Sequence, residues 1–161
     1  MTKNRFILPL ACALGALGGV ASADVVYFET IPGARSANDM TPDGRFIVGE
    51  METFQPYIYD TQLGTITLLP FETGAEAVAV SNDGKTVLGS HYEEFAPDQW
   101  AEVAAIWTEA SGTWTSLGFL PQAGFCPSRS NGYELSADGS VAVGLSWVGC
   151  SGRGFRWTAE G

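Results

Sequence analysis

Short apolar runs separated by polar turns recur along the chain, and three of them follow one nine-residue pattern. The pattern is a hydroxyl residue, any residue, Asp-Gly, two variable positions, two apolar residues and Gly, at 41–49, 81–89 and 136–144. Asp-Gly before an apolar run predicts a tight turn that feeds a strand, because Gly accepts positive φ and Asp bonds its own backbone. Turn formation, rather than calcium binding or catalysis, therefore explains the three Asp-Gly pairs: Asp43, Gly44, Asp83, Gly84, Asp138 and Gly139.

The spacing of these patterns predicts the architecture. Their final glycines lie 40 and 55 residues apart, periods that favour propellers or solenoids. Each pattern is followed by a short segment with an aromatic residue, and the middle copy predicts four strands at about 76–80, 86–92, 103–108 and 113–118. The second strand of each unit is apolar without alternation, which predicts burial on both faces. We therefore expect an all-β fold of tandem four-stranded antiparallel units, a partial β-propeller of about three blades at 34–70, 75–121 and 125–161.

The two ends of this array do not show whether the repeats close into a ring. Residues 24–33 match the last strand of a unit without the three strands that should precede it, and 156–161 stop where such a last strand is expected. A truncated piece of a longer propeller is the favoured interpretation. An open three-unit stack with capped edges and a ring completed by self-association are the alternatives.

The N-terminal segment has the features of an export signal. Lys3 and Arg5 precede an apolar run at 6–20, and Ala-Ser-Ala at 21–23 matches a cleavage site, which predicts a signal peptide at 1–23. A membrane-spanning helix and a lipoprotein signal at Cys12 are the weaker alternatives. We expect one domain at 24–161, secreted, periplasmic or on the cell surface, with no membrane span after cleavage.

Charge narrows the possible partners. All 18 acidic residues follow position 23, whereas two of the eight basic residues precede it, so the processed chain carries a formal charge of about −12. Such a surface repels phosphate backbones and anionic lipid, which excludes nucleic acid as the expected partner.

Two cysteines, Cys126 and Cys150, remain after the predicted cleavage. In an exported chain this pair predicts a disulfide rather than a metal site, which would need further Cys or His beside the single His91. In a four-stranded meander the two connections that hold them emerge on the same face. The bond would close 24 residues and stabilise the fold by about 3 kcal/mol.

The longest insertion, at 90–102, is predicted to be a loop between the second and third strands of the middle unit. Long loops on repeat scaffolds often bind ligands, and this one mixes aromatic residues with carboxylates. Its aromatics suit a sugar ring or a peptide, and its carboxylates suit Ca²⁺. The binding candidates are Tyr92, Glu93, Glu94, Asp98 and Trp100, with Phe95 beside them. The alternative is a solvated acidic loop whose aromatics pack against the blade.

The repeats resemble a known family. Ser-Ala-Asp-Gly-Ser-Val-Ala-Val-Gly at 136–144, Phe-Arg-Trp-Thr at 155–158 and Leu-Gly-Phe-Leu-Pro at 117–121 are similar to the HAF-type extracellular repeat of secreted bacterial proteins. The resemblance covers nearly all of 24–161 and implies propeller-like repeats on an exported protein. It implies no catalytic residues, and the chain departs from the family in having few repeats.

Together these patterns predict an exported, non-enzymatic binding or surface-interaction module. Its ligand is unknown, with a glycan or a protein at the cell surface as the candidates. We expect no cofactor, Ca²⁺ being the one ion that the acidic insertion suggests. The alternative function is that of a fragment of a propeller-class hydrolase or lyase.

Overall fold

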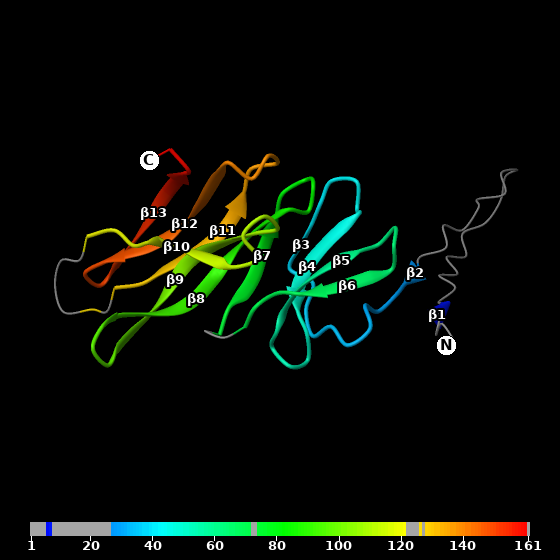
Figure 1. Cartoon of the computed structure of the whole chain (residues 1–161), viewed down its shortest axis with the longest axis horizontal. Helices are drawn as coiled ribbons and strands as arrows, with labels where there is room; N and C mark the ends of the chain where they lie inside the picture. Colours follow the sequence, from blue (N-terminus) through cyan, green and yellow to red (C-terminus); the bar gives the residue numbers. More distant parts are fainter. Residues whose placement is uncertain (1–5, 8–26, 72–73, 122–125, 127, 161) are drawn as a thin grey trace, which may run out of the picture. The chain divides into compact units, whose positions relative to one another are not determined.

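The computed structural model describes residues 6–7, 27–71, 74–121, 126 and 128–160, and every regular element in these ranges is a β-strand (Figure 1). The chain divides into two units, 1–32 and 33–161. In the first unit, β1 (Phe6–Ile7) pairs antiparallel with β2 (Tyr27–Phe28). Most of the predicted signal peptide, and 24–26 of the predicted orphan strand, lie outside the described residues. In the part that is described, no helix has the length and apolarity needed to cross a membrane.

The second unit contains three antiparallel sheets in sequence order, which confirms the predicted all-β, propeller-like repeat architecture. The first sheet contains β3 (Asp39–Met40), β4 (Phe46–Glu50), β5 (Pro56–Asp60) and β6 (Thr65–Leu68). The second contains β7 (Glu76–Val80), β8 (Thr86–Ala96), β9 (Gln99–Thr108) and β10 (Trp114–Gly118). The third contains β11 (Ser130–Leu135), β12 (Val141–Val148) and β13 (Ser151–Thr158) among the described residues.

A close backbone approach explains the glycine that ends each repeat pattern. A Cβ on Gly49, Gly89 or Gly144 would overlap a carbonyl oxygen of the neighbouring first-strand segment, that of Ser36, Glu76 or Asn131. In the second and third sheets a β-bulge lies beside this contact, between Ala77 and Ala79 and between Gly132 and Glu134. Glycine is therefore required there by contact with backbone, which cannot move aside as a side chain can.

Two hydrophobic cores hold the three sheets together, one on each face of the second sheet. Alternate residues of β8 point to opposite faces, so Val87 lies in the core shared with the first sheet and Leu88 in the core shared with the third. Burial on both faces is thus correct for the second sheet. It is wrong for the first sheet, where Ile47 is only half-buried, and for the third, where Val143 is 40% exposed, because within the described residues no further sheet packs on those faces.

Hydrogen bonds between sheets supplement these cores. The Asn38 side-chain amide donates to the Ala77 carbonyl at 2.8 Å, and the Val80 amide donates to the Asp39 carboxylate at 2.9 Å. Both bonds join the innermost strand of one sheet to that of the next. They fix the first sheet on the second in one register.

Candidate functional site

The three Asp-Gly turns share one hydrogen-bond pattern. In the first, the Thr41 hydroxyl donates to Asp43 Oδ1 at 2.6 Å, the Arg45 amide donates to the same oxygen at 3.0 Å, and the Phe46 amide donates to Thr41 Oγ1 at 3.0 Å. The same bonds recur in the turns at 81–86 and 136–141. The glycines adopt φ of 70° to 74°, where a side chain is strained.

These bonds also set the acidity of the turn aspartates. The hydroxyl hydrogen bond first, and the amide hydrogen bond second, lower the pKa of Asp43, Asp83 and Asp138, the last from 3.8 to about 2. One oxygen of each carboxylate is therefore committed to its own turn.

The predicted loop at 90–102 is instead the end of a long β-hairpin (Figure 1). β8 and β9 remain paired from Thr86 and Thr108 as far as Ala96 and Gln99, so the prediction of an irregular loop was wrong. The turn holds Pro97 and Asp98, and Asp98 adopts a left-handed φ of 60°. Glu94 Oε1 accepts the Asp98 amide at 2.9 Å, so the turn is closed by a carboxylate from its own hairpin. Polar residues can extend these strands because paired strands are joined by hydrogen bonds between backbone groups, which form with polar and apolar side chains alike.

The hairpin brings together some of the candidate residues and separates others. Tyr92 pairs with Glu102, and Glu94 pairs with Trp100, so these four side chains share one face of the hairpin. We call this set, Tyr92, Glu94, Trp100 and Glu102, the aromatic–acidic face. Glu93 lies on the opposite face with His91, because neighbouring residues in a strand point to opposite sides.

The aromatics of the hairpin differ in their surroundings. Tyr92 is 50% exposed and Trp100 is 57% exposed. Phe95, by contrast, packs edge-to-face on Phe119, with ring centroids 6.0 Å apart. Phe95 is nevertheless 43% exposed, so its packing on Phe119 leaves part of the residue in solvent, and Tyr92 and Trp100 are somewhat more exposed.

A pair of carboxylates lies at the base of the same face. Ser90 Oγ is 3.0 Å from Glu76 Oε1 and 3.0 Å from Glu102 Oε1. Burial raises the pKa of Glu76, the Ser90 hydrogen bond lowers it, and the charges of Glu102 and Glu50 raise it. The Ser90 hydroxyl has one hydrogen and donates to one carboxylate, so the second contact is favourable when the other carboxyl is protonated. The sequence did not reveal this pair, because it depends on the register between β7 and β8 across a bulge.

His91 is half-buried on the opposite face of the hairpin. Its Nε2 lies 3.9 Å from Glu93 Oε2. Burial lowers the pKa of His91, and the Glu93 carboxylate acts in the other direction. The lowered pKa favours the neutral form of the His91 imidazole.

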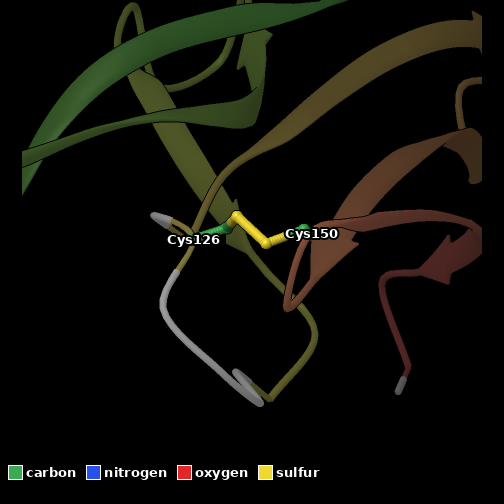
Figure 2. Close-up of a disulfide and its surroundings, with 2 residues drawn as sticks. All are labelled: Cys126 and Cys150. Atoms are coloured by element: carbon green, nitrogen blue, oxygen red, sulfur yellow. A yellow bond between two sulfur atoms is a disulfide. The ribbon is translucent and has the colours of Figure 1, made fainter.

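The disulfide between Cys126 and Cys150 is confirmed (Figure 2). It joins the connection before β11 to the turn between β12 and β13, and the Cα atoms are 5.2 Å apart. Beside it the Arg129 guanidinium lies 4.3 Å from the centre of the Trp147 ring, and a cavity of about 230 Å³ is lined by Cys126, Arg129, Trp147 and Cys150. Sequence reasoning found the disulfide from the cysteine count but did not identify the arginine–tryptophan contact.

Among the described residues, no three His, Cys, Asp or Glu side chains are grouped in a way that could hold a metal ion. Of the proposed Ca²⁺ ligands, Glu93 and Glu94 are neighbours on β8 and point to opposite faces of the hairpin, and Glu94 Oε1 accepts the Asp98 amide. The hairpin thus presents aromatic rings and carboxylates on one face without a converging ligand set.

The comparisons with known proteins bear on the fold. No family model matches the chain, and no curated protein matches it. Among solved structures, the chain is similar to the crystal structure of the tricorn protease, with a TM-score of 0.51 and 15% sequence identity. The match covers 78% of this chain and 12% of that one, so the chain spans a small part of that protein. That protease contains β-propeller domains, and the likeness shows a propeller-type fold.

Proposed function

We propose that the protein is an exported, non-enzymatic binding module that holds a glycan on the aromatic–acidic face of the β8–β9 hairpin. The observation that carries this proposal is the half-exposed pair Tyr92 and Trp100, set among carboxylates on one long antiparallel hairpin. Exposed aromatics held in place by a scaffold lose little conformational entropy when they bind.

The chemistry of the face favours sugars that are neutral or positively charged. An aromatic ring stacks on the apolar face of a pyranose, while the neighbouring carboxylates accept hydrogen bonds from its hydroxyl or ammonium groups. The formal charge of about −12 on residues 24–161 disfavours sulfated or uronic polymers. Export is supported by the disulfide, since such bonds persist in oxidising compartments.

The test is a titration of the purified protein with neutral and amino-sugar oligosaccharides, with calorimetry and tryptophan fluorescence as the two readouts of binding. Trp100→Ala should weaken binding by about tenfold or more, as expected for an aromatic anchor. Tyr133→Ala is the matched control, because Tyr133 is 55% exposed but lies on β11. Equal effects of the two substitutions, or no saturable binding to any of these sugars, would contradict the proposal.

A hydrolase is the second candidate, and the Glu76–Glu102 pair is the observation that favours it. Acid–base hydrolysis of glycosidic bonds uses two carboxyl groups, and burial raises the pKa of one member of this pair, Glu76. The test is release of the leaving group from chromogenic glycosides across a range of pH. If the pair is catalytic, the wild type should release the leaving group and Glu102→Gln should abolish this turnover. If the protein only binds, the wild type and Glu102→Gln should both show no more than the uncatalysed rate.

A further inference from the structure

The two interfaces between sheets use the same positions of the repeat. Aligned on the final glycines, Val80, Val87 and Trp107 of the second sheet are equivalent to Leu135, Ala142 and Trp157 of the third. The first set lies in the core shared with the first sheet, and the second set lies in or against the core shared with the second sheet. We call this surface of a sheet its entry face.

The opposite surface of each sheet supplies the other half of these interfaces. Val48 and Ile58 of the first sheet pack on the entry face of the second, and Leu88 and Ile106 of the second pack on the entry face of the third. We call this surface the exit face. Each interface inside the chain is therefore the exit face of one sheet on the entry face of the next.

The first sheet has an entry face of the same kind, and no sheet formed by the described residues of the second unit covers it. Its residues are Met40, Ile47, Tyr59 and, on β6, Ile66 and Leu68. Met40 is 61% exposed, although its equivalent Val80 is 6% exposed. Leu68 is 51% exposed, so this face leaves two large apolar side chains in solvent, and burying them against a partner is favourable.

The third sheet offers a matching exit face, formed by Glu134, Val143 and Arg156. Arg156 is equivalent to Ile58, and Tyr59 is equivalent to Trp107; Ile58 and Trp107 lie in the same core, so a new interface of this kind would bring Arg156 and Tyr59 to the same contact. An arginine on a tyrosine ring is a favourable cation–π pair. Glu134 is equivalent to Asp39, whose carboxylate accepts the Val80 amide, so Glu134 would accept the Met40 amide.

From this equivalence we propose that a second copy of the chain docks head-to-tail, with the exit face of its third sheet on the entry face of the first sheet. The contact is heterologous, so it propagates until a ring closes or a filament forms. It does not depend on the proposed glycan binding, which involves the β8–β9 hairpin of the second sheet.

The test is a pair of complementary variants of the purified protein, studied by sedimentation equilibrium. Met40→Glu blocks the entry face and Val143→Glu blocks the exit face, each by placing an unpaired charge in the interface. Wild-type protein should show a mean mass that rises with concentration, and each variant alone should bind itself at least about tenfold more weakly. An equimolar mixture of the two variants should form a heterodimer and stop there, because the remaining faces are the blocked ones.

Three results would overturn the proposal. Wild-type protein that stays monomeric at every concentration would show that nothing docks, or that the chain's own N-terminal segment covers the face. Val143→Glu protein that self-associates as well as wild type would indicate pairing of two entry faces. A mixture that stays monomeric while both variants keep the wild-type circular dichroism spectrum would exclude head-to-tail contact. Leu68→Glu and Arg156→Glu, at other exposed positions of the same faces, repeat the test if either first variant fails to fold.

Discussion

At the end of the sheets that carries the Asp-Gly turns, all three sheets use the same hydrogen bonds, whereas at the opposite end no two sheets are alike. There the second strands β4, β8 and β12 are 5, 11 and 8 residues long, and the third strands β5, β9 and β13 are 5, 10 and 8 residues long. A disulfide is also present at this end, in the third repeat. The end with the Asp-Gly turns has a conserved backbone geometry in all three sheets. The opposite end varies between sheets and carries the exposed hairpin and the disulfide, so the two ends should respond differently to substitution.

The largest effect on stability is expected at the variable end, from its covalent link. Replacing Cys126 and Cys150 with serine opens a 24-residue loop and should lower the free energy of unfolding by about 3 kcal/mol. Urea unfolding of the double variant and of the oxidised parent measures this difference. A loss below about 1 kcal/mol would mean that the β11–β13 meander holds the connection in place without the bond.

The next largest effect is expected in a repeated turn. Ser81 is fully buried, and its hydroxyl donates to Asp83 at 2.7 Å and accepts the Thr86 amide at 3.0 Å. Ser81→Ala leaves the Thr86 amide without its acceptor and removes one of the two hydrogen bonds to Asp83 Oδ1, which keeps the Lys85 amide, and should cost about 1–3 kcal/mol of unfolding free energy. Ser136→Ala removes the same bonds in a half-exposed turn, where water replaces them, and should cost less. Equal losses would show that burial does not distinguish the turns.

The two ends should also differ in how pH affects stability. Asp138 has its pKa lowered from 3.8 to about 2 in the folded protein, so its contribution is present above pH 3.8 and is lost as pH falls through about 2. The pKa of Glu76 is raised above 4.5 in the folded protein, so the contribution of its protonated form to stability is fully present below pH 4.5. This contribution is lost as pH rises through the pKa that Glu76 has in the folded protein.

Thermal unfolding across pH 2–8 separates these contributions when wild type is compared with single variants. Asp138→Asn should flatten the curve at its acidic limit, and Glu76→Gln should remove the decline on the other side. If Glu76→Gln leaves the curve unchanged, the Glu76 carboxyl is ionised at no cost in the folded protein.

The smallest effect on stability is expected on the aromatic–acidic face. Trp100→Ala should change the unfolding free energy by less than about 0.5 kcal/mol, because the ring is mostly in solvent. Chemical unfolding of this variant beside Tyr133→Ala provides the measurement. A loss comparable with that of Ser81→Ala would mean that the ring supports the hairpin rather than a ligand.

The same contrast explains what the sequence predicts. The hydrogen bonds of the Asp-Gly turns join residues two to five positions apart, so the local sequence predicts them. Only two cysteines follow the predicted cleavage site, so only one disulfide pairing is possible within 24–161. The extension of β8 and β9 was missed because Glu93 and Glu94 on β8 and Glu102 on β9 break the apolar alternation that identifies strands. The Pro97–Asp98 dipeptide did carry a turn signal that sets the tip of the hairpin. The Glu76–Ser90–Glu102 contacts depend on a bulged register between strands, which no local pattern encodes.

The glycine at the end of each repeat has a consequence for protein engineering. Since Gly89 lies against the backbone of Glu76, and the turn before it satisfies its own polar groups, residues 75–121 can be copied in tandem without redesigning either feature. Stability in such an array is a sum over units and their nearest-neighbour contacts. A synthetic gene carrying several copies of this segment would therefore gain one covered sheet per copy, with a hairpin on each available to display a chosen binding sequence.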